Sequence, residues 1–242
     1  MQLVVEHDLQ TELVLPINYQ HIMQGIIYNS LHSIAGYGDF LHNNGYEFGE
    51  RQYRLFTFSR LYGRYRIEKE HIIFKDHVSF EVRSTDNILL RILQENILQN
   101  GIQYRNQKYY GVTAVIKDET IEEEEIRIRM LTPIVAYETD ALTKKTNFFI
   151  PDQEEFYYSV QDNFIRKYSA YADCEVREEI EFFPLKVTDK DKCVTKYKGI
   201  YMTGWLGEYL LKGKRKYLDF LFQVGIGSKN AQGFGMFQVI EN

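Results

Sequence analysis

The order in which strand-like and helix-like segments follow one another constrains the fold of this 242-residue chain more than any other feature. Runs rich in aromatic and β-branched residues, typical of strands, occupy residues 2–15, 52–59, 63–84 and 109–118. Two further segments, from Pro16 to about residue 33 and from Asp86 to residue 99, carry apolar residues at helical spacing, and Asp86 suits an N-cap. The first half therefore predicts the order β-α-β-β-α-β, with residues 2–15 as a strand or a broken hairpin.

The second half repeats this order after a run of acidic residues. Residues 118–125 read DETIEEEE, which is typical of a solvated connection. Beyond it, strand-like runs lie at residues 126–137, 175–187, 196–211 and 235–242, and helical patterns at 152–170 and 214–224. Because β-α-β-β-α-β is the order of a ferredoxin-like unit, we predict an α+β fold of two tandem ferredoxin-like (RRM-like) βαββαβ units, with domains at residues 1–120 and 121–242.

The net charge of −5 argues mildly against a nucleic-acid partner, but the basic residues are clustered. Between residues 45 and 75, seven Lys or Arg face four Glu, which leaves a local charge of +3. Between residues 206 and 229, five Lys or Arg face two acidic residues, which again leaves +3. Such patches are often solvated strand edges, yet they also suit a phosphate backbone. The sequence shows neither a long apolar run nor a signal-peptide pattern, so we expect a cytoplasmic protein without membrane contact.

The segment GIGSKNAQGFGMF, residues 225–237, places four glycines within eleven residues. It precedes a strand, whereas a dinucleotide-binding loop precedes a helix, and it lacks the Gly-Lys-Ser/Thr of a P-loop. A flexible helix-to-strand connection would need only one glycine. The other interpretation is a cradle in which bare N–H groups point at the phosphates of a polymer. Its expected members are Gly225, Gly227, Ser228, Lys229, Asn230, Gly233 and Gly235.

This glycine segment resembles the C-terminal glycine-rich signature of the CRISPR-associated endoribonuclease Cas six family, whose members cut the repeat RNA of CRISPR transcripts. LPINYQHIMQGIIYNSLHSIAGYGDFLHNNGY, followed by YRLFTFS, is similar to that family's first helix, histidine-bearing loop and second strand. The resemblance covers the whole chain. It implies metal-independent cleavage without a cofactor, in which the RNA 2′-hydroxyl attacks the phosphate and leaves 2′,3′-cyclic phosphate and 5′-hydroxyl ends.

The resemblance also assigns catalytic residues. His42 in DFLHNNG matches the family's catalytic histidine, and Tyr28 in GIIYNSL matches its helix tyrosine. The third family position is usually lysine and is here Arg54, with Arg51 and Arg60 as nearby competitors. An arginine can stabilise a pentavalent phosphate but cannot exchange a proton.

His32 is a candidate that goes beyond the family match. It lies four residues after Tyr28, on the same face of the predicted helix. It is either a second catalytic or phosphate-contacting imidazole, or an ordinary histidine on the helix surface. Loss of its side chain would leave cleavage nearly intact in the second case.

The expected partner is CRISPR repeat RNA, single-stranded or weakly structured. Arg51 near the proposed catalytic site, and Lys214 and Arg215 beside the glycine segment, are expected to contact its phosphates. By the resemblance, the enzyme either keeps its product or hands it to a multisubunit CRISPR interference complex, and a homodimer is a further expectation. Two other functions stay open on the sequence: a non-catalytic repeat-RNA-binding subunit of the same superfamily, and a nucleotide-binding regulatory module.

Overall fold

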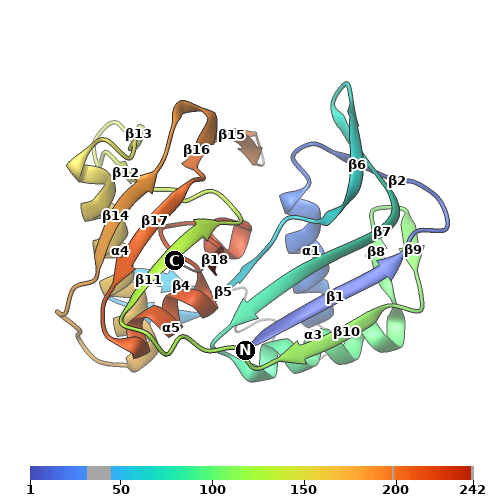
Figure 1. Cartoon of the computed structure of the whole chain (residues 1–242), viewed down its shortest axis with the longest axis horizontal. Helices are drawn as coiled ribbons and strands as arrows, with labels where there is room; N and C mark the ends of the chain where they lie inside the picture. The colour runs from blue at the N-terminus through green and yellow to red at the C-terminus, as the bar shows by residue number, and fades with distance from the viewer. Residues whose placement is uncertain (32–44, 198, 241–242) are drawn as a thin grey trace.

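A computed structural model describes residues 1–31, 45–197 and 199–240 (Figure 1). Two units lie side by side, and each consists of an antiparallel sheet with helices against one face. The first sheet uses strands between residues 2 and 117, and the second uses strands between residues 125 and 240. None of the described helices is long and apolar enough to cross a membrane.

The first sheet is built around the long strand β7 (His71–Ser84). Along one edge β7 pairs with β1 (Gln2–Asp8) and β2 (Leu13–Pro16), along the other with β5 (Phe56–Phe58) and β6 (Tyr62–Glu68), and β10 (Thr113–Lys117) pairs with β1. Residues 2–15 are therefore two strands that share β7, rather than one hairpin. The predicted helix start is also wrong, because Pro16 ends β2 and α1 (Gln20–Leu31) begins four residues later.

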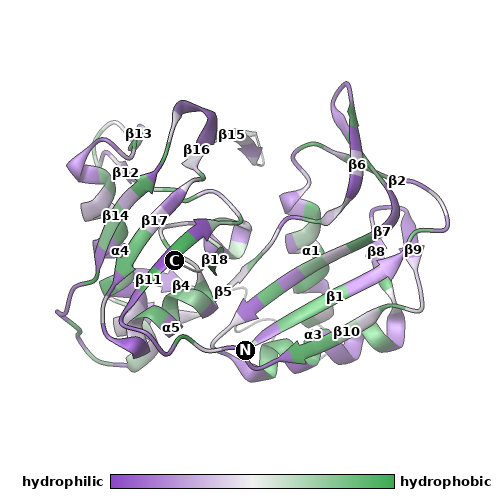
Figure 2. Ribbon diagram, in the orientation of Figure 1, coloured by the Kyte–Doolittle hydropathy of each residue, from purple (hydrophilic) through white to green (hydrophobic). Residues whose placement is uncertain are grey.

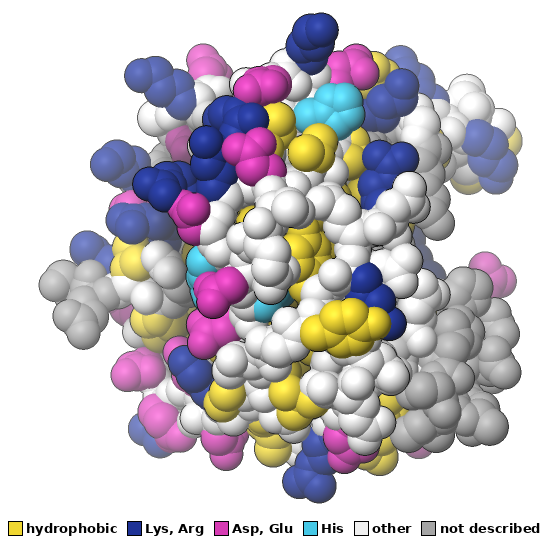
Figure 3. Space-filling model, turned by 90° about the vertical axis from the view of Figure 1, so that its right-hand side faces the viewer, with side chains coloured by type: hydrophobic (Ala, Val, Ile, Leu, Met, Phe, Trp, Pro, Cys, Tyr) yellow, Lys and Arg dark blue, Asp and Glu magenta, His cyan; other side chains and the backbone are white. Residues whose placement is uncertain are grey.

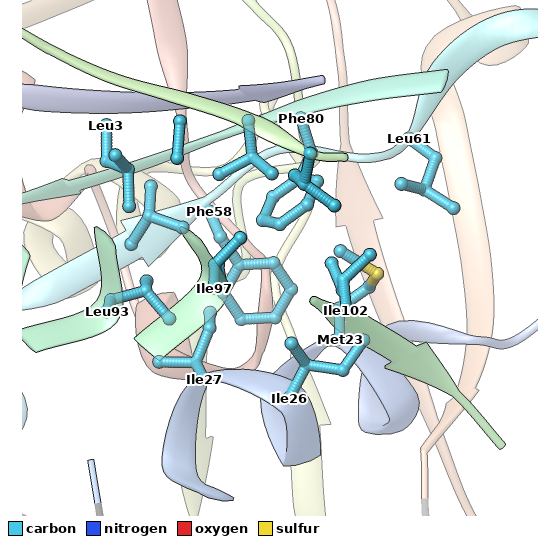
Figure 4. Close-up of a cluster of buried hydrophobic side chains, with 14 of the residues drawn as sticks. Leu3, Met23, Ile26, Ile27, Phe58, Leu61, Phe80, Leu93, Ile97 and Ile102 are labelled. Carbon is cyan, nitrogen blue, oxygen red and sulfur yellow. The ribbon is translucent and has the colours of Figure 1, made fainter. Parts of the chain in front are cut away.

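Helices α1 and α3 (Asn87–Asn100) cover one face of this sheet. The predicted N-cap is confirmed, because the Asp86 carboxylate accepts hydrogen bonds from the N–H groups of Ile88 at 2.9 Å and Leu89 at 3.3 Å. The two helices and the sheet meet in a continuous apolar core that includes Leu3, Met23, Ile26, Ile27, Phe58, Phe80, Leu93 and Ile97 (Figure 4). Each of these buried side chains contributes about 1.5–3 kcal/mol through loss of water contact, which fixes α1 firmly on the sheet.

The second unit repeats the arrangement. Its sheet has the order β14 (Glu181–Lys186), β17 (Glu208–Lys212), β11 (Glu125–Met130), β18 (Phe237–Ile240), and its helices are α4 (Glu154–Ala172) and α5 (Arg215–Val224). In the first unit, β10 lies beside β1, and β1 lies beside β7. In the second unit, β18 lies beside β11, and β11 lies beside β17, so both sheets have the strand order of a ferredoxin-like fold. The predicted fold class is confirmed.

Four short hairpins extend the two units. They are β3 (Tyr46–Phe48) with β4 (Arg51–Tyr53), β8 (Ile102–Tyr104) with β9 (Gln107–Tyr109), β12 (Tyr137–Thr139) with β13 (Thr146–Phe148), and β15 (Lys192–Tyr197) with β16 (Ile200–Trp205). The single strand expected over residues 126–137 thus divides, because β11 ends at Met130 and β12 begins at Tyr137. In Figure 2 the projecting end of the β6–β7 hairpin is mostly hydrophilic, as its exposed position requires.

The two units are joined by buried contacts as well as by the chain. Leu55 of the first unit belongs to the apolar core of the second. Arg83 on β7 is only 4% exposed, and its Nη1 donates to the carbonyl oxygen of Phe237 at 2.6 Å. Its guanidinium also stacks over the ring of Phe222, with 3.9 Å between the carbon and the ring centroid. These contacts fix the position of one unit relative to the other.

Candidate functional site

A cleft of about 1320 Å³ lies between the two units and is lined by residues from both. One wall comes from α1 and from the segment 51–54. The other comes from β12, α4 and the glycine-rich loop, residues 225–236. His21, Gln24, Gly25 and Tyr28, spaced three or four residues apart or adjacent on α1, present the polar face of this helix to the cleft.

Tyr28 and Arg54 meet on the first wall. The ring of Tyr28 packs edge-to-face on Phe56, with 5.9 Å between centroids, so it lies between the core and the cleft rather than on an open surface. Burial raises the pKa of Tyr28, while the charge of Arg54 and a hydrogen bond with it act in the opposite direction. At neutral pH the pair therefore offers a neutral hydroxyl beside a permanent cation.

His42 and His32, the two predicted histidines, lie outside the described residues. Their roles stay predictions. Arg51 lies on β4 and lines the cleft, as expected, two positions before Tyr53. Within the described ranges, no group of three or more His, Cys, Asp or Glu side chains is placed to hold a metal ion.

Lys214 and Arg215 do not lie at the cleft, which corrects the expectation that they flank the glycine loop in space. They lie where α5 begins, whereas the loop starts where α5 ends, about 15 Å away along the helix axis. Lys214 forms an ion pair with Glu178, and Arg215 with Glu122 at 3.9 Å. Their charges are therefore already matched by carboxylates of the protein.

The basic residues between positions 45 and 75, the first basic patch, are likewise separated from one another by the fold. Its distal members lie on the β6–β7 hairpin among acidic side chains: Arg66 lies 2.7 Å from Glu12, Lys75 lies 3.4 Å from Glu12, and Arg64 pairs with Asp76. In Figure 3, basic and acidic side chains intermingle on this end of the first unit. Arg51 and Arg54 are the members of this patch that line the cleft.

The four glycines of the loop face the interior. All are buried and have positive φ, and a Cβ at Gly235 would lie 2.0 Å from the carbonyl oxygen of Ile226. A Cβ at Gly233 would lie 2.7 Å from the ring of Phe58 in the first unit. Glycine is thus required here for backbone shape and close packing.

Three of the four glycines cannot contribute to the predicted amide cradle. The N–H groups of Gly225, Gly233 and Gly235 donate to carbonyl oxygens of Leu221, Asn230 and Pro133, at 2.8 to 2.9 Å. An N–H that is already bonded inside the protein cannot also point at a phosphate. The loop can meet a ligand in the cleft through its outer residues Ser228, Lys229 and Gln232.

A buried lysine that the sequence reasoning missed holds the loop in this shape. Lys167 of α4 is 3% exposed, and its Nζ donates to the carbonyl oxygens of Gly225 at 2.7 Å and Gly227 at 3.2 Å, and to Oδ1 of Asn230 at 2.8 Å. Burial lowers the pKa of Lys167 to about 7. The available signal was its place seven residues after Val160, on the apolar stripe of the helix.

Side chains also connect the loop to α1 and to β12. Gln24 of α1 donates to the carbonyl oxygen of Ala231 at 2.7 Å and accepts a hydrogen bond from the hydroxyl of Tyr197. The ammonium of Lys229 lies 5.1 Å from the centroid of the Tyr137 ring. The cleft is therefore a preformed site with cations and hydroxyl groups at one side, an arrangement that suits an extended anionic ligand.

Comparisons with known proteins show the family to which the chain is similar. Residues 116–239 match the family model described as CRISPR associated protein Cas6, C-terminal. The chain is 28% identical to the CRISPR-associated endoribonuclease Cas6 1 of Methanocaldococcus jannaschii, over 98% of this chain and 93% of that protein. It is 24% identical to the CRISPR-associated endoribonuclease Cas6 of Pyrococcus furiosus, over 99% and 89% of the two lengths.

The fold is shared with solved structures. One, described as an RAMP protein binding different RNA substrates, superimposes with a TM-score of 0.80 at 22% identity and covers 99% of each chain. At this identity the likeness concerns the fold. Since the family model spans more than half of the 242 residues, the chain belongs to the Cas6 family.

Proposed function

We propose that this chain is a metal-independent endoribonuclease that cuts CRISPR precursor transcripts within the repeat, at the cleft between its two units. The observation that carries the proposal is the meeting of Tyr28 and Arg54 on the first wall, where a phosphate would reach both. Both relatives described above bear the name endoribonuclease. The RNA 2′-hydroxyl would be the nucleophile, so the products would end in a 2′,3′-cyclic phosphate and a 5′-hydroxyl.

The described residues suit two of the three tasks of such a reaction. The Arg54 guanidinium carries a permanent charge and a planar set of donors that can bind two phosphate oxygens at once as negative charge develops. The Tyr28 hydroxyl, neutral because burial raises its pKa, can donate a hydrogen bond to the same phosphate. Proton transfer is assigned to His42 on the sequence resemblance alone, with His32 as an accessory candidate.

RNA phosphates beyond the cut would contact Arg51 on β4 and Lys229 of the loop, which line the same cleft. The glycines contribute indirectly, because they let the loop pack against Phe58 and still present its outer residues. We further propose that the chain divides into functional domains near residue 120, with the catalytic pair in the first and the loop in the second. A homodimer and membership of a multisubunit CRISPR interference complex are also proposed, and gel filtration with and without repeat RNA tests the former.

Cleavage of the host's CRISPR repeat RNA in EDTA tests the proposal. Wild type is expected to cut at one site, while a substrate with a 2′-deoxy group at that site stays intact. Arg54→Ala is expected to slow cleavage by about 10²–10³-fold, because it removes a donor to the developing charge. His42→Ala is expected to slow it by about 10²–10⁴-fold, as for loss of a general acid or base.

Arg64→Ala is the matched control, because Arg64 lies on the exposed hairpin in an ion pair with Asp76. It is expected to cut like wild type. If wild type binds the repeat RNA and never cuts it, the chain is a non-catalytic RNA-binding subunit instead. If it binds ATP or GTP but no RNA, the chain is a nucleotide-binding module.

A further inference from the structure

Carboxylates in the cleft are concentrated on one part of its second wall. The first wall carries Arg51 and Arg54. The second wall carries Lys229 on the glycine-rich loop, and Glu138 of β12 with Glu155 and Asp162 of α4, of which Asp162 is paired with Arg166. A phosphate about 4 Å from a carboxylate would be repelled by ~1 kcal/mol in water and by ~4 kcal/mol at the lower dielectric near a protein surface. A nucleic-acid backbone in this cleft would therefore follow Arg51 and Arg54 of the first wall and Lys229 of the loop, and its bases would project towards α4.

The side of α4 that faces the cleft is polar along two helical turns. Glu155, Tyr158, Ser159, Asp162 and Asn163 line the cleft, at spacings of three and four residues. On the opposite side of the helix, apolar side chains at 156, 160 and 164 are buried in the core of the second unit. The cleft-facing side is thus held rigidly in place, and its residues Glu155, Tyr158 and Asp162 remain exposed.

Tyr158 is the exposed aromatic side chain of this face. It is 68% exposed, and none of the ring or cation contacts found among the described residues involves it. Its neighbour Tyr157 instead packs on Phe156 and Phe182 and donates a hydrogen bond to the carbonyl oxygen of Pro151 at 2.5 Å. Tyr158 therefore presents a free ring face inside the cleft, which is the surface on which an unpaired base stacks.

One of the two carboxylates beside this ring is oriented by an ion pair. Asp162 Oδ1 accepts from Arg166 Nε at 2.9 Å, one helical turn further along α4. Glu155 lies in the first turn of the helix, one turn before Tyr158 on the same side. A carboxylate accepts hydrogen bonds from the amino group of cytosine, and by the same chemistry from those of adenine and guanine, but uracil has no such group.

We propose that Glu155, Tyr158 and Asp162 form a base-binding subsite on α4, in which Tyr158 stacks on one unpaired base and the two carboxylates accept hydrogen bonds from base amino groups. This inference rests on the proposed function, because it places the RNA in the same cleft. It adds that the chain selects its substrate at α4, across the cleft from the residues that would cut it. The ligand class is unpaired RNA rich in adenine, cytosine or guanine.

Binding of repeat RNA that is 2′-deoxy at the cut site, measured by fluorescence anisotropy over a series of salt concentrations, tests the stack. Tyr158→Ala is expected to weaken binding by about 5- to 150-fold, the loss of one base–aromatic stack, with an unchanged salt slope. Tyr158→Phe keeps the ring and is expected to bind like wild type. Tyr110→Ala is the matched control, because Tyr110 is 64% exposed on the first unit and does not line the cleft.

Short oligo(A), oligo(C) and oligo(U) test the carboxylates. Wild type is expected to prefer oligo(A) and oligo(C) over oligo(U), and Glu155→Met combined with Asp162→Leu, which removes the acceptor oxygens, is expected to lose that preference. Glu154→Met is the control, since Glu154 shares the first helical turn but does not line the cleft.

Three results would overturn the inference. Equal RNA affinities of the Tyr158→Ala and Tyr110→Ala variants would show that no base stacks on Tyr158. Tighter binding and a steeper salt slope in the carboxylate double variant would place the phosphates, rather than the bases, beside α4. Absence of RNA binding by wild type would overturn the proposed function and this subsite together, whereas wild-type binding with unaffected α4 variants would overturn the subsite alone.

Discussion

Two buried cations hold this molecule together in different ways. Arg83 at the junction of the units donates to a carboxylate, Glu81, at 2.9 Å, to the amide oxygen of Gln2 at 2.9 Å, and to the backbone of Phe237. Lys167 beneath the glycine loop donates to two backbone carbonyls and one amide oxygen, and none of these partners carries a charge. The charge of Arg83 is balanced by the carboxylate of Glu81. The ammonium of Lys167 has only neutral hydrogen-bond acceptors as partners.

The difference shows in their protonation. Burial lowers the pKa of Arg83, Glu81 acts in the opposite direction, and an arginine stays charged because its ordinary pKa lies above 12. Burial lowers the pKa of Lys167 to about 7, with no counter-charge to oppose it. The junction therefore depends on a permanent charge, whereas the loop is held by a group that titrates near neutral pH.

The largest effect is expected at the junction. Arg83→Met would leave Glu81 and the carbonyl of Phe237 without their partner, and should lower the free energy of unfolding by about 3–5 kcal/mol. Urea denaturation followed by far-UV circular dichroism measures this. Arg64→Met, at an exposed pair, should change stability by less than about 1 kcal/mol. Equal effects of the two variants would remove the special role of the buried arginine.

A smaller effect is expected at the loop. Lys167→Met replaces the ammonium with an apolar chain of similar length and leaves three neutral acceptors unpaired, at a cost of about 1–3 kcal/mol. The same denaturation experiment measures it, and RNA affinity should fall with it because Lys229 and Ser228 belong to the released segment. A variant that is as stable as wild type and binds RNA normally would show that the loop keeps its shape without the lysine.

The smallest effect is a dependence on pH. Because burial lowers the pKa of Lys167 to about 7 in the folded state, whereas an exposed lysine has a pKa of about 10.5, the unfolded chain binds more protons between these values. The contribution of this group to stability therefore rises as the pH increases above 7, by up to about 1.4 kcal/mol per pH unit, and is lost as the pH falls back towards 7. The difference in unfolding free energy between wild type and Lys167→Met should increase by about 1 kcal/mol between pH 7 and pH 8. A difference that does not change with pH would show that the pKa of Lys167 is not lowered in the folded state.

Much of the fold could be predicted from the sequence because the helices and strands follow simple periodicities. The stripes of α3 and α4 and the N-cap at Asp86 are local properties, and the structure confirms them. Errors arose where pairing is non-local. Pro16 was predicted to begin a helix, but it is the last residue of β2, where it pairs with His71 on β7.

The candidate site was predictable only in part, for the same reason. The polar face of α1 and Arg54 could be placed at one wall from sequence resemblance and helical spacing. Lys214 and Arg215 are near the glycine loop in sequence, but ten residues of helix separate them from it in space. The contact of Lys167 with Gly225 joins residues 58 positions apart, and no local pattern encodes it.

The position of Leu55 has a consequence for how this chain can be rearranged. It belongs to the first unit in sequence but is buried in the core of the second, so a cut at the acidic connection would expose an apolar side chain on one fragment and open a hole in the other. Two separately expressed halves should therefore recombine rather than act as independent modules. Insertions should be tolerated best far from this junction, at the turn between β12 and β13, where Leu142 is 93% exposed.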